Sequence, residues 1–114
     1  MINKLRTFKN EEFGALRTTI IGGEPYFCAK DVAKALGYAR PRAAVFEHCS
    51  IVIEELVRTK GGNQKMLFIS GCDVYRLVTG SKLPSAEKFK SWVFDEVSRK
   101  LRQTGSYSIT KQAS

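Results

Sequence analysis

The chain has 114 residues, of which 43% are hydrophobic, which is enough for one packed domain and too many for a disordered tail. Nineteen lysines and arginines oppose eleven aspartates and glutamates, so the net charge is +8. This balance favours a polyanionic partner such as DNA, RNA or an anionic membrane surface, although such a charge also serves solubility alone. Because the apolar runs are too short to span a bilayer and the first residues lead into no signal-peptide core, we expect a cytoplasmic protein with no membrane association.

The residue types offer little for catalysis or metal binding. Cys28, Cys49 and Cys72 form no Cys-x-x-Cys pair, so reduced thiols are expected rather than a disulfide framework. A zinc site made by these cysteines with His48 is disfavoured, because structural zinc sites usually take their ligands as close pairs. The chain also lacks a P-loop, a GxGxxG and a GxSxG sequence. We therefore expect no enzyme, no cofactor and no metal.

The first third of the chain predicts a hairpin and then a helix. A polar turn at residues 9–12 precedes a β-branched strand over residues 16–21. Gly22-Gly23 is a two-residue hairpin signal that returns into a strand over residues 24–27. From Asp31 the apolar residues follow a helical spacing, and Gly37 suits the left-handed position that ends a helix.

A second short helix is predicted to begin at Pro41 and to reach about Cys49, since proline suits the first helical turn. Two further strands are expected over residues 51–57 and 66–69, joined by a basic turn over residues 58–65. Ser70 and Asp73 form an S-x-x-D capping signal for a helix that Gly80 closes.

The last predicted element is the longest, a helix of about 19 residues that begins at Pro84-Ser85 and ends at Gly105. Together these elements predict an α+β fold: a small antiparallel sheet of about four short strands, packed by about four helices that include a helix-turn-helix-like pair. We expect one domain over residues 1–105, followed by a polar tail or the start of a linker over residues 106–114.

The helix pair is the strongest candidate for contacting DNA. In a helix-turn-helix the second helix enters the major groove with its N-terminal residues toward the bases, and Arg40 and Arg42 occupy those positions here. Lys30 and Lys34 on the first helix could hold the phosphate backbone. An ordinary helical hairpin with two exposed arginines explains the same pattern, and the residues alone leave both interpretations open.

The basic turn is the second candidate. Arg58, Lys60 and Lys65 carry positive charge there without a neighbouring acid, and Asn63 and Gln64 could read adenine. A flexible surface turn is the alternative. Beyond Glu96 the chain is again basic. The candidate DNA-binding set is Lys30, Lys34, Arg40, Arg42, Arg58, Lys60, Asn63, Gln64, Lys65, Lys82, Arg99, Lys100 and Arg102.

Eight stretches carry a family resemblance in order along the chain: FGALRT (13–18), GEPYF (23–27), AKDVAKALGY (29–38), HC (48–49), GGNQKM (61–66), DVYRL (73–77), SKLPSAEKF (81–89) and WVFDEV (92–97). With them the chain resembles the N-terminal domain of the BRO family, found in phage antirepressors and in BRO proteins of baculoviruses and other large viruses. The resemblance covers nearly the whole chain.

The resemblance implies a DNA-binding module of mixed α/β structure in an antirepressor-like transcriptional regulator, located in the bacterial host cytoplasm if a phage encodes it. It singles out Lys30, Asp31, Lys82 and the turn at 61–64 as family positions. The implied partner is double-stranded DNA, and a phage repressor and a second copy of the chain are further candidate partners. The alternative function is a protein-interaction module that binds and inactivates a phage repressor.

Two positions depart from the family pattern. Arg99 stands where the family commonly has proline, so the last helix need not kink. Arg40 stands where a polar cap residue usually precedes the second helix, which weakens capping and adds a candidate DNA contact.

Overall fold

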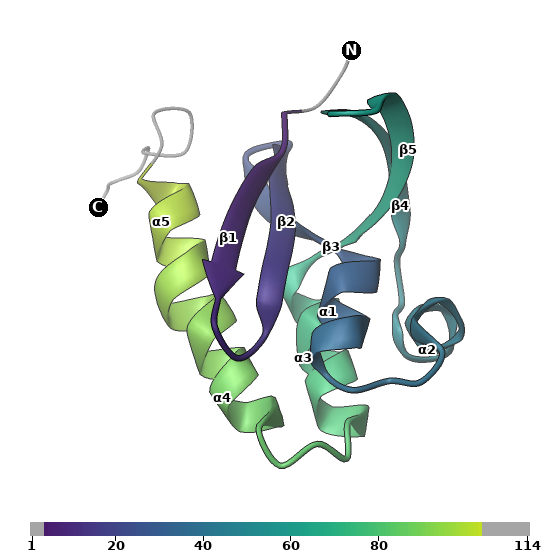
Figure 1. Ribbon diagram of the computed structural model, residues 1–114, viewed down its shortest axis with the longest axis vertical. Helices are drawn as coiled ribbons and strands as arrows, with labels where there is room; N and C mark the ends of the chain where they lie inside the picture. The colour runs from purple at the N-terminus through teal and green to yellow at the C-terminus, as the bar shows by residue number, and fades with distance from the viewer. Residues whose placement is uncertain (1–3, 104–114) are drawn as a thin grey trace.

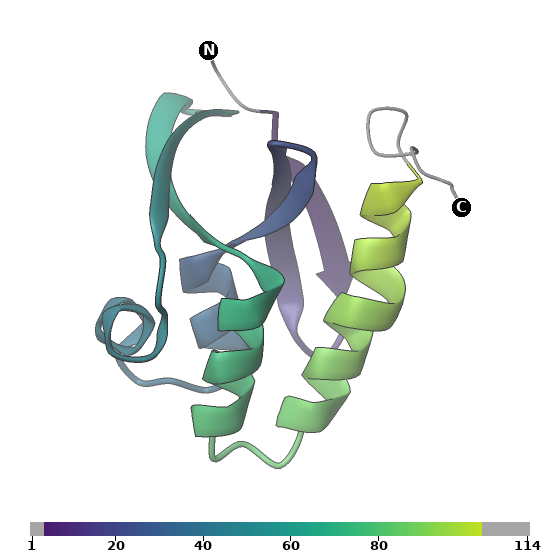
Figure 2. The ribbon, with the colours of Figure 1, turned by 180° about the vertical axis from the view of Figure 1, so that it is seen from behind.

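The computed structural model describes residues 4–103, and within them it has the expected α+β architecture. All the strands pair antiparallel in one sheet. In the described part of the chain this sheet has five strands, rather than the predicted number of about four. Their order across the sheet is β1 (Arg6–Asn10), β2 (Gly14–Ile21), β3 (Glu24–Cys28), β5 (Gly62–Ile69) and β4 (Ile53–Thr59). The helices α1 (Ala29–Ala35) and α3 (Gly71–Gly80) lie at the centre of the molecule. Helix α2 (Pro41–His48) lies on one side, and the C-terminal helical segment (86–102) lies on the other (Figures 1 and 2).

The first hairpin follows the prediction. Strand β2 (Gly14–Ile21) pairs with β3 (Glu24–Cys28). The two-residue turn between them has φ angles of +59° at Gly22 and +83° at Gly23. Glycine adopts such angles without steric cost, and this turn matches the twist of the flanking strands.

The prediction of a polar turn at 9–12 was wrong by two residues. Lys9 and Asn10 belong to an additional edge strand, β1 (Arg6–Asn10), which pairs with β2. The turn follows it, and the Asn10 side-chain oxygen accepts hydrogen bonds from the backbone amides of Glu12 at 2.8 Å and Phe13 at 3.1 Å. Phe8 is the only apolar residue of β1, so the strand carries too little alternation to be recognised.

The second hairpin is longer than expected. Strand β4 (Ile53–Thr59) pairs over its whole length with β5 (Gly62–Ile69), from Thr59 opposite Gly62 to Ile53 opposite Phe68. The predicted basic turn over residues 58–65 is therefore mostly strand, and only Lys60 and Gly61 connect the two strands. Polar side chains extend to the tip because this end of the hairpin is exposed to solvent, so no apolar pattern marks it.

The helix-turn-helix-like pair is present. Helix α1 (Ala29–Ala35) begins two residues before the predicted start, and α2 (Pro41–His48) ends close to the predicted limit. Gly37 has a φ of +82°, as predicted. Arg40 precedes α2 without a side-chain capping hydrogen bond, which agrees with the missing polar cap noted in the sequence.

Helix α3 (Gly71–Gly80) is present, but the predicted capping box at its start is not formed. Ser70 makes no side-chain cap hydrogen bond. The carboxylate of Asp73, which is 2% exposed, instead accepts hydrogen bonds from the backbone amides of Ser50 at 2.9 Å and Ile51 at 3.1 Å. The acid of the S-x-x-D pattern therefore anchors the connection between α2 and β4.

The C-terminal helical segment is continuous but not uniform. An α-helical turn, α4 (Ala86–Ser91), is followed by a π-helical segment, η1 (Trp92–Val97), and then by α5 (Ser98–Arg102). The prediction of a single regular α-helix was wrong in this respect, because the wider turn of a π-helix leaves no mark in the apolar spacing. Its predicted end at Gly105, and the predicted tail over residues 106–114, lie outside the described residues.

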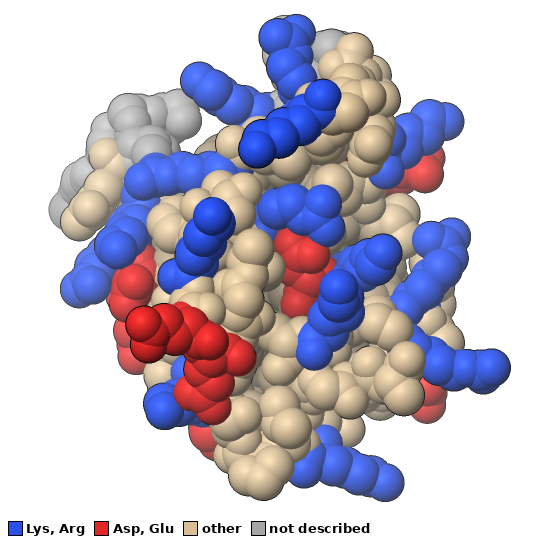
Figure 3. Space-filling view, in the orientation of Figure 1, with Lys and Arg blue, Asp and Glu red and all other residues tan. Residues whose placement is uncertain are grey.

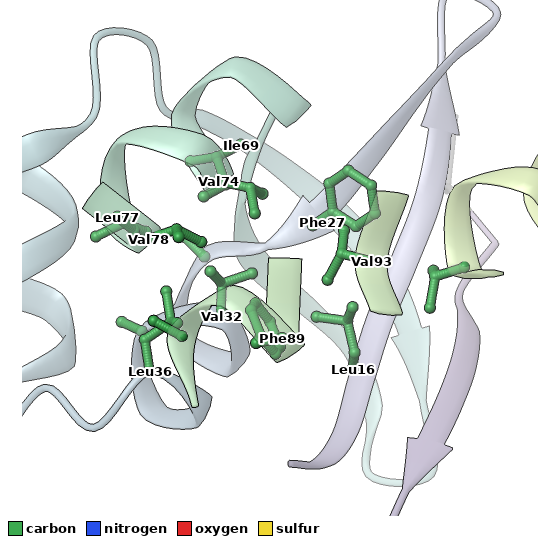
Figure 4. Close-up of a cluster of buried hydrophobic side chains, with 14 of the residues drawn as sticks. Leu16, Phe27, Val32, Leu36, Ile69, Val74, Leu77, Val78, Phe89 and Val93 are labelled. Atoms are coloured by element: carbon green, nitrogen blue, oxygen red, sulfur yellow. The ribbon is translucent and has the colours of Figure 1, made fainter. Parts of the chain in front are cut away.

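The core lies where α1, α3 and the C-terminal segment meet the sheet. Leu16 and Phe27 come from strands, Val32 from α1, Val74 from α3 and Phe89 from α4, and all five are buried side by side (Figure 4). This core fixes the position of α1, and α2 packs mainly on α1 and α3. The described helices include none that is long and apolar enough to cross a membrane.

Candidate nucleic-acid interface

A hollow of about 410 Å³ opens between the start of α1, the start of α2 and strand β5. We call it the basic hollow. Four basic side chains line it, and no acidic one is found among its described lining residues. Its other lining residues are mostly apolar or small. The full lining is Arg17, Cys28, Ala29, Lys30, Pro41, Arg42, Val45, Gln64, Lys65, Met66 and Leu67.

Four separate segments bring the four basic residues together. Lys30 lies in the first turn of α1, Arg42 in the first turn of α2, and Lys65 on β5. The fourth, Arg17, comes from β2. Lys30, Arg42 and Lys65 are exposed and were predicted as candidate DNA-binding residues. The fold thus joins the helix pair and the basic hairpin, which the sequence presented as two independent candidates, into one surface.

Arg17 is the residue that sequence reasoning missed. Its Nε and Nη2 atoms each donate a hydrogen bond of 2.8 Å to a different carboxylate oxygen of Asp31, and its backbone amide donates a third bond to Asp31 at 3.0 Å. These bonds to Asp31 raise the pKa of Arg17 further above its usual value. The pair lies 14 residues apart in sequence, and only the position of α1 against β2 brings it together.

Because Asp31 neutralises Arg17, the net positive charge of the basic hollow comes from Lys30, Arg42 and Lys65. Arg17 still contributes a guanidinium in a fixed orientation, since a bidentate pair restricts both side chains. The Arg42 guanidinium lies over the ring of Phe46, one turn further along α2, at 5.2 Å from the ring centroid. A cation–π contact of this kind orients Arg42 along the helix.

The hairpin extends the basic surface beyond the hollow. Arg58 and Asn63 are cross-strand neighbours close to the tip, and Lys60 lies in the turn itself. Gln64 lines the hollow together with Lys65. Figure 3 shows Lys and Arg side chains over the upper and right-hand parts of the face that carries α1, α2 and the hairpin, while acidic side chains gather mainly at its lower left.

Two further predicted residues flank this surface. Lys34 is exposed one turn after Lys30 on α1 and lines a neighbouring hollow with Arg17, Asp31 and Glu12. Arg40 is exposed in the turn before α2. Lys82 is exposed in the connection between α3 and α4, away from the lining of the basic hollow.

The structure places the basic C-terminal residues elsewhere. Arg99, Lys100 and Arg102 belong to α5, which lies on the opposite side of the molecule from α2 in both ribbon views (Figures 1 and 2). Lys100 pairs with Glu96 at 3.3 Å. Arg99 lines a hollow whose lining residues include the acids Glu11, Glu12, Asp95 and Glu96. The candidate residues thus form a main group around α1, α2 and the hairpin, and a separate group on α5.

The described residues contain no group of three or more His, Cys, Asp or Glu side chains placed to hold a metal ion. Cys49 is half-buried, and burial raises the pKa of its thiol to about 11. Burial likewise raises the pKa of Cys28, which also lines the hollow. At neutral pH these two thiols are protonated, and the thiol rather than the reactive thiolate is present. His48 packs its ring against Tyr38, with centroids 5.6 Å apart.

Comparison with known proteins gives a consistent result. Residues 15–99 match the family described as BRO family, N-terminal domain. An uncharacterised protein of Haemophilus influenzae is 41% identical over 92 residues, which cover 79% of this chain and 46% of that protein. Two putative Bro-N domain-containing proteins of Invertebrate iridescent virus 6, 289L and 201R, are 29% and 31% identical, and the matches cover 26% and 27% of their lengths. The chain therefore spans less than half the length of these relatives. No solved structure matches it.

Proposed function

We propose that the chain binds duplex DNA through the basic hollow and the adjoining hairpin. The premise is that the chain belongs to the BRO family, because residues 15–99 match the N-terminal domain of that family. The family domain is in general a DNA-binding module and not an enzyme. The observation that carries the proposal is the convergence of basic side chains from β2, α1, α2 and β5 on one hollow whose described lining residues include no acid. Positive residues gathered in this way neutralise backbone phosphates and release their counterions.

The geometry supports a division of roles. Arg42, in the first turn of α2, is placed to reach base edges if α2 enters the major groove. Lys30 and Lys34 lie four residues apart on α1, so both can follow a phosphate backbone. Asn63 and Gln64 on β5 have the side-chain amides that can pair with adenine.

A salt titration of DNA affinity tests the electrostatic part of this proposal. Six phosphate contacts, which the exposed basic residues of α1, α2 and the hairpin could supply, predict a slope of about −5 for log affinity against log salt concentration. We expect a linear, steep loss of affinity in fluorescence anisotropy with a short duplex. An affinity that does not change with salt would rule out phosphate contacts as the main source of binding.

We further propose that the domain serves an antirepressor-like transcriptional regulator, in which DNA binding positions the protein on a regulatory region. The other candidate function is binding to a phage repressor. It predicts a stable complex with that repressor at salt concentrations that abolish DNA binding. Mobility shifts on the regulatory region, performed with and without the repressor, separate the two functions.

A further inference from the structure

We propose that two copies of this chain pair through the outer edge of β4, joining their sheets into one. This inference concerns an edge whose residues do not line the basic hollow, although Arg58 also belongs to the hairpin surface proposed above for DNA. It does not depend on DNA binding. In the described part of the chain β4 pairs only with β5, and its other edge has no strand beside it. The hairpin lies at one margin of the molecule in both ribbon views (Figures 1 and 2).

The backbone groups on this edge can be identified from the hairpin register. Thr59 and Gly62 close a two-residue turn, so this pair exchanges both of its hydrogen bonds. The bonding then alternates along β4, which leaves the amide and carbonyl groups of Glu54, Leu56 and Arg58 on the outer edge. An exposed row of such groups is a template for another strand.

The side chains of these residues are self-complementary. Glu54, Leu56 and Arg58 share one face of β4 because they are spaced two apart, and all three are exposed. Leu56 is the central residue of the strand. An antiparallel pairing of two copies that uses the whole strand therefore places Leu56 opposite Leu56, and each Glu54 opposite the Arg58 of the second copy.

This register matches both the backbone and the charges. Each cross-strand pair joins residues whose amide and carbonyl groups point outward, so every pair can exchange two hydrogen bonds. Opposite charges that face each other across strands are stabilising, and like charges are destabilising. Within the described residues neither Glu54 nor Arg58 makes an ion pair of its own. Pairing with a second copy thus gives both charges a partner.

A two-fold axis perpendicular to the joined sheet follows from this pairing, since the same strand contributes from both copies. Such an axis keeps the basic hollow of each copy on the same side of the sheet. The dimer would then present two equivalent basic surfaces toward one ligand.

Charge exchange on β4 tests the proposal, with the full chain and without DNA. Glu54→Arg places two arginines opposite each other, and Arg58→Glu places two glutamates opposite each other. Since each substitution affects both symmetric pairs, we expect either variant to raise the dimer dissociation constant roughly tenfold in sedimentation equilibrium. The double variant Glu54→Arg/Arg58→Glu should restore dimerisation, because it re-forms both pairs with reversed polarity.

An equimolar mixture of the two single variants provides the sharpest control. The Glu54→Arg variant carries arginine at both positions 54 and 58, and the Arg58→Glu variant carries glutamate at both. The mixture should therefore form a heterodimer, although neither variant dimerises well alone. Arg42→Ala lies outside the edge and should leave dimerisation unchanged. A wild-type chain that remains monomeric, or single variants that dimerise as well as the wild type, would overturn the proposal. Circular dichroism confirms that each variant is folded.

Discussion

At the scale of single residues, two aspartates hold together the segments that build the candidate interface. Asp31 fixes Arg17 through three hydrogen bonds and thereby ties the start of α1 to β2. Asp73 ties the connection between α2 and β4 to the start of α3 through the amides of Ser50 and Ile51. Each carboxylate accepts hydrogen bonds from backbone amides of another segment, and such bonds to charged groups are among the stronger ones in proteins.

Replacing Asp73 with alanine should therefore destabilise the protein. The substitution removes the acceptor for two backbone amides at a site where the side chain is 2% exposed. We expect the free energy of unfolding to fall by about 2 kcal/mol, measured by urea denaturation. Asp73→Asn keeps one acceptor oxygen and should lose less. Equal stability of Asp73→Ala and the wild type would show that these bonds contribute nothing.

At the scale of elements, strong local signals made most of the fold predictable. Gly22-Gly23 indicated the first turn and Gly37 the end of α1, because these positions have positive φ angles that few residues adopt. Pro41 indicated the start of α2, because the first helical turn needs no amide donor at that position. Strand β1 has one apolar residue and gave no such signal. The capping box was misleading, since Asp73 had a tertiary partner that the chain order alone does not reveal.

Gly80, the last residue of α3, is required by the packing of the helix and not by its backbone conformation. It ends α3 with an ordinary φ angle, so left-handed geometry does not explain the glycine. A Cβ atom there would lie 2.8 Å from the Tyr38 hydroxyl and 2.9 Å from Cε1 of His48. The close approach lets the Tyr38 hydroxyl donate a hydrogen bond of 2.7 Å to the carbonyl oxygen of Leu77. Gly80 thus allows α3 to lie close to the helix pair.

Gly80→Ala should consequently lower stability, although alanine is favoured over glycine in most helices by about 1 kcal/mol. We expect a loss of about 1–3 kcal/mol in the free energy of unfolding, because Tyr38 and His48 must move. Thr79→Ala, at an exposed neighbouring position, serves as the control and should change stability by less than about 0.5 kcal/mol. A stabilised Gly80→Ala variant would contradict the packing argument.

At the scale of the whole molecule, the net charge of +8 is divided between separate surfaces. The sequence identified the basic residues of the hollow except Arg17, but it could not show that Arg42 and Lys65 line the same hollow or that Arg99 lies apart with acidic neighbours. Such proximity depends on how α1, α2 and the hairpin pack together, and residues more than 20 positions apart leave no local pattern. The composition favoured a polyanionic partner, and the fold gathers part of the positive charge around one hollow, where the proposed DNA contact would lie.

The most direct test of that surface compares two substitutions that remove the same charge from different places. Arg42→Ala removes a guanidinium from the basic hollow, whereas Arg99→Ala removes one from α5. Both variants have the same net charge, so a difference between them reports position and not total charge. The measurement is the affinity of each variant for the same duplex DNA at one salt concentration. We expect Arg42→Ala to weaken binding by about 1–3 kcal/mol and Arg99→Ala to have little effect. Equal affinities for the two variants would contradict the assignment of DNA binding to the basic hollow.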